Sequence, residues 1–203
     1  MSAETGERGA SEPKQRIVIV RHGETEWSKI RRHTGLTDLP LTQEGREQAR
    51  GLVDTLAGLQ FTAVFVSPLR RARETCALAG FEHRAVVDPD LVEWDYGAYE
   101  GKTNAEIQEF NPGWLLFRDG APGGENIDDV AARAARVIER ARAVSGDVLM
   151  FGHGHQLRVT TSLWLAFAPV AAQHLQLETA SPSTLGYERD WTALLSWNGL
   201  HKD

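Results

Sequence analysis

Cysteine, long apolar runs and basic charge are all scarce in this 203-residue sequence, and each shortage excludes a class of protein. The lone cysteine, Cys76, rules out an internal disulfide framework and fits a reducing compartment. No apolar run is long enough to cross a bilayer, and no signal peptide is recognisable. The net charge of −6 disfavours a nucleic-acid partner, because phosphate backbones are bound by an excess of Lys and Arg. We therefore expect a cytoplasmic protein with neither a nucleic-acid nor a membrane partner.

The length suits one sizeable core, and no internal segment resembles a linker between domains. We expect residues 16–203 to form a single catalytic domain. Residues 1–15 are mostly polar and carry hardly any apolar side chains, so they cannot bury enough surface to become ordered. They are predicted to form a disordered N-terminal tail.

Three short apolar runs, each followed by helix-like sequence, end in turns that carry histidine or arginine. The runs are residues 17–20 before Arg21 and His22, 61–66 before Arg70 and Arg71, and 147–151 before His153 and His155. Runs of this length are typical of buried strands. The carboxyl ends of parallel strands meet at one edge of a sheet, where α/β proteins place their ligands. The pattern predicts an α/β fold in three layers, with a mostly parallel sheet between helices and these side chains in one crevice.

Helical periodicity and capping residues recur between the strands. Helices are predicted over residues 42–58, 69–79, 103–111, 126–144 and 157–167. Arg133, Arg136 and Arg140 fall on the side of one helix opposite its apolar stripe, which indicates a solvated face. Residues 174–197 alternate between apolar and polar, which predicts an antiparallel hairpin at the sheet edge. Such an edge offers pairing positions to a second copy of the chain, which would give a homodimer.

A crevice holding Arg21, Arg70, His22 and His153 favours phosphate as its occupant. Two guanidinium groups repel each other unless a dianion lies between them, and their planar forks match phosphate oxygens. A neutral imidazole is a competent nucleophile toward phosphorus and forms a covalent phosphohistidine. Either histidine can take this role on the sequence alone, and the other, protonated, would donate to the phosphoryl oxygens.

The leaving oxygen needs a proton donor, and Glu93 is the candidate. It follows a short apolar step and lies among aromatic residues, a partly desolvated setting that suits a carboxyl group for proton transfer. Asp95 is the local competitor. Phosphoryl transfer from a phosphate ester, with neither metal nor cofactor, is the chemistry that these residues predict.

The ordered motifs resemble those of the histidine phosphatase superfamily, which includes the cofactor-dependent phosphoglycerate mutases. The resemblance extends over nearly the whole chain from Arg16. The matching segments are residues 21–25 (RHGET), 38–42 (DLPLT), 67–72 (SPLRRA), 93–101, 122–125 (PGGE) and 152–154 (GHG).

The resemblance implies a role for each matching residue. His22 would be the phosphorylated nucleophile and Glu93 the proton donor, with Arg21, Arg70 and His153 around the phosphate. Thr34 and Gly35 match loop positions that contact substrate in the mutases. The candidate substrate- and phosphate-binding residues are Arg21, Ser28, Thr34, Gly35, Arg70, Tyr96, His153 and Gly154. Further candidates for the outer pocket are Arg31, Arg32, Trp94, Trp114 and Arg118.

Departures from the family pattern favour hydrolysis over mutase activity. Ser28 stands where the family often has Asn, and Trp94 stands where the mutases have an arginine that handles a carboxylate. Residues 101–123 are also shorter than the mutase insertion that encloses phosphoglycerate. A more open pocket admits water to the phosphohistidine, whereas a mutase excludes it. A phosphatase acting on a phosphorylated small molecule, including sugar phosphates, is therefore expected, with a phosphoglycerate mutase as the alternative.

Two other classes compete with this interpretation. A metallohydrolase would use His153 and His155, which point the same way on an extended chain, with His22, His33 and nearby carboxylates. Paired arginines do not belong in the first coordination shell of a metal, so this alternative ranks lower. A catalytically silent phosphate sensor would have lost His22 or Glu93, and the sequence keeps both.

Overall fold

Within residues 14–200, which the computed structural model describes, six strands form one sheet in the order β3-β2-β4-β1-β5-β6. The strands are β1 (Ile17–Arg21), β2 (Ala63–Val66), β3 (Ala85–Val87), β4 (Val148–Gly152), β5 (Pro182–Glu188) and β6 (Trp191–Ser196). The pairings among β1 to β4 are parallel, and β5 runs antiparallel to both β1 and β6. The predicted mixed sheet with its antiparallel C-terminal hairpin is confirmed.

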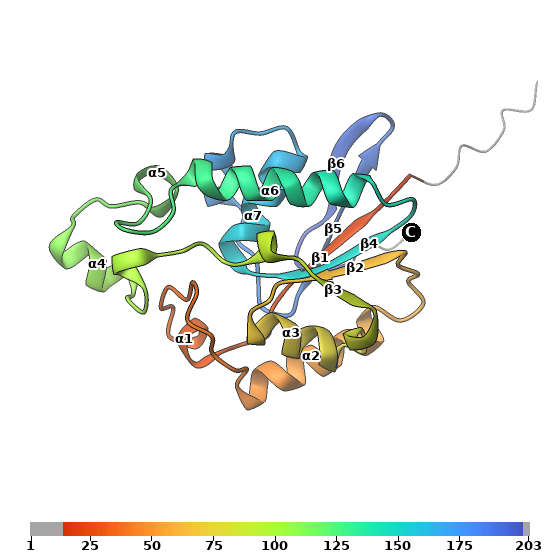
Figure 1. Ribbon diagram of the computed structural model, residues 1–203, viewed down its shortest axis with the longest axis horizontal. Coiled ribbons are helices and arrows are strands. Elements are labelled where there is room, and N and C mark those ends of the chain that lie inside the picture. Colours follow the sequence, from red (N-terminus) through yellow and green to blue (C-terminus); the bar gives the residue numbers. More distant parts are fainter. Residues whose placement is uncertain (1–13, 201–203) are drawn as a thin grey trace, which may run out of the picture.

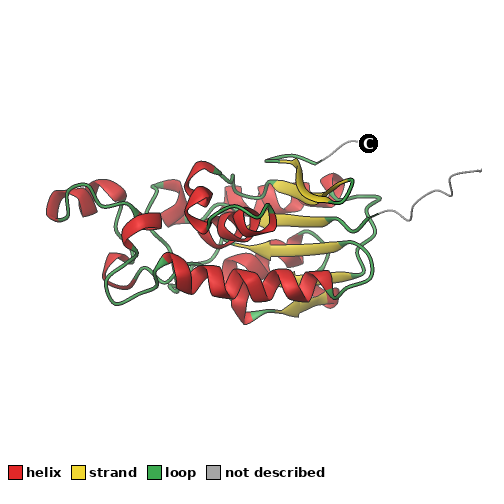
Figure 2. Cartoon of the chain, turned by 90° about the horizontal axis from the view of Figure 1, so that it is seen from above, coloured by secondary structure: helices red, strands yellow, loops and turns green. Residues whose placement is uncertain are grey.

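Helices cover both faces of the sheet. They are α1 (Glu26–Lys29), α2 (Gln43–Thr55), α3 (Arg70–Leu78), α4 (Asn104–Phe110), α5 (Leu116–Asp119), α6 (Ile127–Arg142) and α7 (Gly154–Trp164). Helices α6 and α7 lie over one face, and α2 and α3 lie over the other (Figure 1). Helical segments also extend past one end of the strands, as the second view shows (Figure 2). Short 3₁₀ turns include η2 (Pro89–Leu91), η3 (Gly97–Tyr99) and η4 (Pro169–His174).

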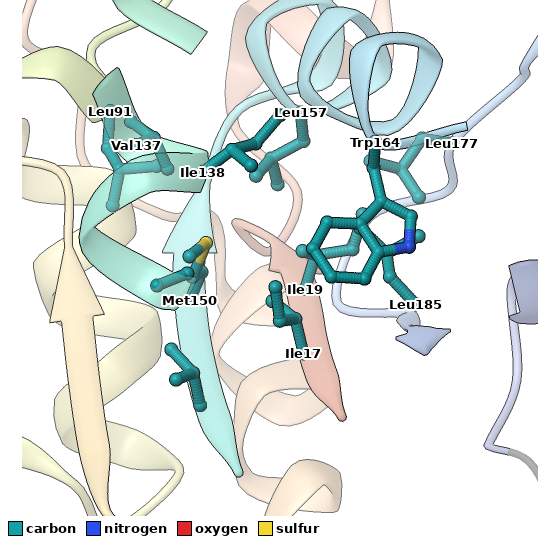
Figure 3. Close-up of a cluster of buried hydrophobic side chains, with 12 residues drawn as sticks. Ile17, Ile19, Leu91, Val137, Ile138, Met150, Leu157, Trp164, Leu177 and Leu185 are labelled. Atoms are coloured by element: carbon teal, nitrogen blue, oxygen red, sulfur yellow. The ribbon is translucent and has the colours of Figure 1, made fainter. Parts of the chain in front are cut away.

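Alternating side chains of the central strands build a separate core on each face. Ile17 and Ile19 of β1 and Met150 of β4 pack with α6 and α7, where Trp164 is buried (Figure 3). Val18 and Val20 of β1 instead pack with residues of α2 and α3. Successive strand residues point to opposite faces, so an uninterrupted apolar run is what a strand buried on both faces requires.

Capping side chains mark the starts of α1, α2, α4 and α6, whereas α3, α5 and α7 begin without one. Thr42 Oγ1 accepts the Gly45 N–H at 3.0 Å before α2, and Thr103 forms a capping box before α4. Helix α7 was expected to begin at residue 157 but begins at Gly154, directly after His153. Strand β3 was not expected, because its three residues carry too little pattern.

Most of the predicted N-terminal tail, residues 1–13, lies outside the described residues. Lys14 Nζ lies 2.8 Å from Asp190, in the turn between β5 and β6. Gln15 donates to three carbonyls near the end of α6; they belong to Ala141, Val144 and Gly146. In the part of the chain described, no helix has the length and apolar character needed to span a bilayer.

The loop after β1 packs its backbone directly on the first turn of α2. A Cβ atom added at Gly45 would lie 2.1 Å from the carbonyl oxygen of Glu24, which also accepts the Thr42 N–H. Main-chain atoms cannot rotate away as a flexible side chain can, so this contact requires glycine.

We therefore predict that Gly45→Ala lowers the free energy of unfolding by about 1–3 kcal/mol, the usual effect of overpacking. Gly51→Ala is the matched control in the same helix, because its added Cβ meets nothing within 4 Å. The control is expected to gain up to about 1 kcal/mol from the higher helix propensity of alanine. Urea unfolding of the two variants tests the contact, and equal stabilities would contradict it.

Candidate active site

The carboxyl ends of β2, β4 and β1 lie side by side, and three of the sequence motifs meet there. The strand order places β4 between the other two. The His22 N–H donates to the Gly152 carbonyl at 3.0 Å, and the Ser67 N–H donates to the Phe151 carbonyl at 2.9 Å. The imidazole rings of His22 and His153 consequently lie 5.2 Å apart between centroids.

His22 is held in one tautomer. Its Nδ1 lies 2.7 Å from the carbonyl oxygen of Gly23, which can only accept, so Nδ1 carries the proton and Nε2 keeps a lone pair. Burial lowers the pKa of His22 well below 6.5, and the charges of Arg71 and Arg21 lower it further. The ring is therefore neutral, with Nε2 available to an electrophile.

His153 is neutral as well, because a guanidinium group donates to it. Arg71 Nε donates to His153 Nδ1 at 3.1 Å, which leaves Nε2–H to donate to Ser67 Oγ at 2.7 Å. Burial and the charge of Arg71 lower the pKa of His153 well below 6.5. The expectation of a protonated second histidine is thus wrong for this structure, since the Nδ1 lone pair already accepts a hydrogen bond.

The buried arginine of α3 is Arg71, and the expected Arg70 lies outside the site. Arg71 is fully buried, whereas the Arg70 side chain is 60% exposed and lies 3.9 Å from Glu74. The other acceptors of the Arg71 guanidinium are the carbonyls of Thr34, Gly35 and Thr37. Consecutive helical residues point about 100° apart, so only one of the two can face the strand ends. The buried positions of α3, which are 71, 72, 75 and 76, carry a helical spacing that favours Arg71.

Arg21 ends β1 with a donor that has no acceptor. Its Nη1 donates to the Leu177 carbonyl at 2.6 Å, but Nε is buried and has no hydrogen-bond partner. A Cβ built on Gly154 would lie 3.4 Å from this Nε and 3.6 Å from Glu93 Oε2. The glycine therefore leaves room beside both groups, and an oxygen of a bound anion would satisfy the unpaired donor.

Glu93 is fixed by the first turn of α7. Its carboxylate accepts three backbone N–H groups, from Trp94 at 2.9 Å, His155 at 3.0 Å and Gln156 at 2.9 Å. These last two N–H groups are among those that a helix N-terminus leaves unpaired. Because α7 begins at Gly154, its end meets Glu93 at the pocket wall.

A pocket of about 590 Å³ opens over His22, Arg21 and Glu93. Its lining also includes Lys29, Arg31 and Arg158, as well as Arg32, which is paired with Glu106. Cations therefore outnumber the carboxylates of the lining, which are Glu24, Glu93 and Glu178. This local positive charge offsets the net negative charge of the chain and suits an anionic ligand.

Most predicted binding residues line this pocket, but several already have protein partners. Ser28, Thr34, Tyr96 and Gly154 are lining residues, while His153 and Gly35 are buried outside the lining. Ser28 Oγ accepts the N–H of Thr25, the N-cap of α1, at 2.8 Å and so completes a capping box, and Thr34 Oγ1 donates to the Arg32 carbonyl. Of the outer candidates, Arg31 and Arg32 line the pocket, and Arg118 does not. Trp94 and Trp114 belong to a buried apolar cluster instead.

The predicted Tyr96 belongs to one wall of the pocket together with His33, His155 and Arg158, which the sequence interpretation did not assign to phosphate binding. The ring of His33 lies 4.7 Å from that of Tyr96, whose hydroxyl lies 2.5 Å from Nδ1 of His155. Burial lowers the pKa of His33 to about 4. Arg158 stacks its guanidinium on Phe117 at 4.8 Å. The spacing of His155 and Arg158 on one helix was a signal for their proximity, but it depends on knowing where α7 begins.

The structure does not bring together the two histidines that the metallohydrolase alternative requires. His153 precedes the first turn of α7 and His155 lies within it, so the two side chains diverge, one toward Ser67 and the other toward Tyr96. Among residues 14–200, no three His, Cys, Asp or Glu side chains are grouped as metal ligands would be. Burial also raises the pKa of the Cys76 thiol to about 12, so it stays protonated within its apolar cluster.

The fold and this group of residues define a class of enzyme. Residues 17–199 match the family model of the histidine phosphatase superfamily (branch 1), and the chain belongs to that superfamily.

Named relatives include phosphatases. The chain is 38% identical over 177 residues to an acid phosphatase of Mycobacterium tuberculosis, covering 85% of this chain and 87% of the relative. It is 39% identical over 181 residues to the sedoheptulose 1,7-bisphosphatase of Saccharomyces cerevisiae, covering 73% and 67%. The solved structure of an open reading frame product from M. tuberculosis superposes with a TM-score of 0.88 at 36% identity, covering 94% of this chain and all of that one.

Exchanging the two neighbouring arginines for lysine separates their contributions. Arg71→Lys keeps a charge but cannot make the several directed bonds of the guanidinium, so we predict a loss of about 100-fold in kcat/KM for a phosphomonoester. Arg70→Lys, at the exposed position, is expected to stay within about twofold of the parent. Phosphate release measures both, with thermal unfolding as the check on folding. A loss confined to Arg70→Lys would reverse this assignment.

Acid should destabilise the folded chain through its buried imidazoles. His33 stays neutral in the folded chain down to a pKa of about 4, whereas in the unfolded chain it takes up a proton near 6.5. The unfolded state binds more protons in that interval, so stability falls as the pH falls, by up to about 1.4 kcal/mol per pH unit for this group. His33→Phe should reduce that slope in urea unfolding between about pH 6 and pH 5. An unchanged slope would show that His33 titrates alike in both states.

Proposed function

We propose that this chain is a phosphomonoester hydrolase that works through a covalent phosphohistidine on His22. The observation that carries the proposal is the tautomer of His22. Nδ1–H is committed to the Gly23 carbonyl, so Nε2 keeps a lone pair at the base of a pocket rich in cations. A neutral imidazole in that position is a nucleophile for an incoming phosphate ester.

The first half of the reaction transfers the phosphoryl group to the enzyme. His22 Nε2 forms a bond to phosphorus while the bond from phosphorus to the ester oxygen breaks. The Glu93 carboxyl group donates its proton to that oxygen, and the alcohol leaves. Splitting the displacement into two steps replaces one difficult reaction by two easier ones.

The second half returns the enzyme to its starting state. Water attacks phosphorus as the bond to Nε2 breaks, and the Glu93 carboxylate takes a proton from the water. Inorganic phosphate is released, His22 is again neutral, and Glu93 is again protonated. Each residue thus ends in the form in which it began.

Positive charge around the phosphate stabilises the transition state. The unpaired Arg21 Nε–H supports an oxygen contact, because a buried donor without an acceptor is unfavourable. Arg71, which donates to Nδ1 of His153, adds a second positive charge beside the two histidines. Phosphoryl transfer asks a protein mainly for positioning and charge neutralisation, which fixed guanidinium groups supply without a metal.

Hydrolysis is favoured over mutase activity by what surrounds the substrate. Trp94 stands where the mutases have an arginine. It is uncharged and buried, and its indole N–H donates to the Glu125 carbonyl, so this position supplies no cation to bind a substrate carboxylate. The pocket, at about 590 Å³, has room for a sugar phosphate and for water. The acid phosphatase and sedoheptulose bisphosphatase relatives support a phosphorylated sugar or similar small molecule as substrate. A phosphoglycerate mutase is the alternative.

The decisive experiment traps the intermediate. Rapid acid-free quenching with a ³²P-labelled sugar phosphate should label the parent enzyme with acid-labile phosphate on His22. His22→Ala should lose both the label and turnover, and His83→Ala, at an exposed position outside the pocket, should keep both. Activity should persist in EDTA.

Three results would overturn the proposal. Retained turnover in His22→Ala would show that His22 is not the nucleophile. Full loss in EDTA with recovery on adding zinc points to the metallohydrolase. Phosphoglycerate interconversion that outpaces phosphate release in the same assays establishes the mutase.

A further inference from the structure

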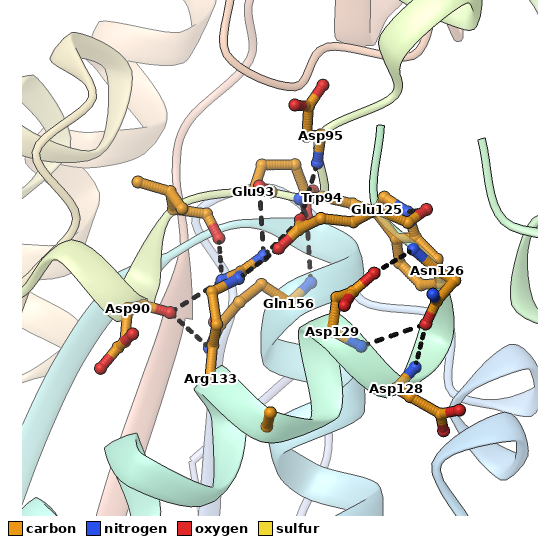
Figure 4. Close-up of polar contacts among 12 residues, drawn as sticks. Asp90, Glu93, Trp94, Asp95, Glu125, Asn126, Asp128, Asp129, Arg133 and Gln156 are labelled. Carbon is orange, nitrogen blue, oxygen red and sulfur yellow. Dashed lines mark hydrogen bonds and ion pairs between the residues drawn. The ribbon is translucent and has the colours of Figure 1, made fainter. Parts of the chain in front are cut away.

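The segment that carries Glu93 runs between η2 and η3 and lies in no strand of the sheet. One side chain of α6 contacts the backbone of this segment at three carbonyls. Arg133 Nη1 donates to the carbonyls of Asp90 at 2.9 Å and Val92 at 3.0 Å, and Nη2 lies 3.4 Å from the carbonyl of Glu93 itself (Figure 4).

Glu125 binds Arg133 and also holds the two residues that follow Glu93. Its carboxylate forms a two-point ion pair with Arg133, at 2.7 Å and 2.9 Å. Oε2 of Glu125 also accepts the Asp95 N–H at 2.9 Å, and its carbonyl accepts the indole N–H of Trp94 at 2.8 Å. The pair therefore grips the chain on both sides of Glu93 (Figure 4).

Arg133 is unlike its neighbours on α6. Its side chain is 11% exposed, whereas Arg136 and Arg140 are 51% and 38% exposed and pair with carboxylates of the η2 turn. The sequence interpretation grouped all three as a solvated face. A buried ion pair is weak support for stability, because desolvation offsets much of its attraction. Its hydrogen bonds to the Glu93 segment indicate a different use.

We propose that Arg133, held by Glu125, is a positioning residue that fixes the Glu93 carboxyl group for proton transfer to the leaving oxygen. This inference rests on the proposed role of Glu93 as the acid. The α7 N–H groups fix the carboxylate, and Arg133 fixes the backbone from which it extends. Both anchors are needed, because a displacement of about 1 Å in a reacting group is enough to lower a rate by about 100-fold.

Leaving-group dependence distinguishes positioning from a structural role. p-Nitrophenolate departs without help from an acid, whereas the alkoxide of glycerol phosphate needs a proton. The ratio kcat/KM reports the phosphoryl transfer to the enzyme, the step in which the leaving group departs. We expect Arg133→Met to lose roughly tenfold more activity on glycerol phosphate than on p-nitrophenyl phosphate. Arg136→Met, which removes an exposed ion pair of the same helix, should treat the two substrates as the parent does.

Glu93→Gln is the reference that separates the two proposals. If it loses activity equally on both substrates, Glu93 is not the acid and the proposed mechanism fails together with this inference. If it discriminates while Arg133→Met does not, the mechanism stands and this inference alone is overturned. Arg133→Lys gives the same comparison should Arg133→Met fail to fold, since lysine keeps the charge but lacks the planar fork.

Discussion

The buried guanidinium of Arg71 is the constraint on which the rest of the site depends. Removing a charge from water is unfavourable by several kcal/mol, so this position requires acceptors on every side. It finds them in His153 Nδ1 and in the carbonyls of residues 34, 35 and 37. One side chain thereby sets the tautomer of His153 and holds the loop beside the pocket, and its charge adds to the effect of burial in lowering the pKa of His22. The loop and the tautomer of His153 thus depend on this one buried charge, whereas the tautomer of His22 is set by the Gly23 carbonyl.

Neutral imidazoles beside buried arginines make the pocket incomplete without an anion. His22 and His153 cannot add positive charge there, because burial and Arg71 disfavour their protonation. The Arg21 Nε donor is nevertheless unpaired. A dianion would satisfy that donor and offset the guanidinium charges while leaving Nε2 of His22 free to attack. The buried guanidinium groups thus favour a bound anion and also help to keep both imidazoles neutral.

The sequence predicted the sheet well because its central strands are buried on both faces and their apolar runs are continuous. It also placed His22, Glu93 and His153 at strand ends and loops that meet. It misplaced the arginine by one residue, since Arg70 and Arg71 are the same residue type and only the rotation of α3 distinguishes them. The start of α7 was misplaced because Gly-His-Gly is a poor helix former that tertiary contacts to Glu93 stabilise. Arg133 was taken for a solvated residue because its acceptors are backbone carbonyls of residues 90 and 92 and the carboxylate of Glu125, which lies outside the helix, so the helical pattern carries no sign of them.

The residues of the site are held in two different ways. His22 and His153 follow central strands, so the hydrogen bonds of the sheet fix them to one another. Glu93 has no such support, and its position depends on an ion pair and on a helix N-terminus contributed by different parts of the chain. The proposed nucleophile is thus fixed by the sheet, whereas the proposed acid is only as well placed as these few contacts allow. In the proposed mechanism Glu93 acts on the leaving group, so variation in those contacts would alter which esters are cleaved while leaving the phosphoryl chemistry intact.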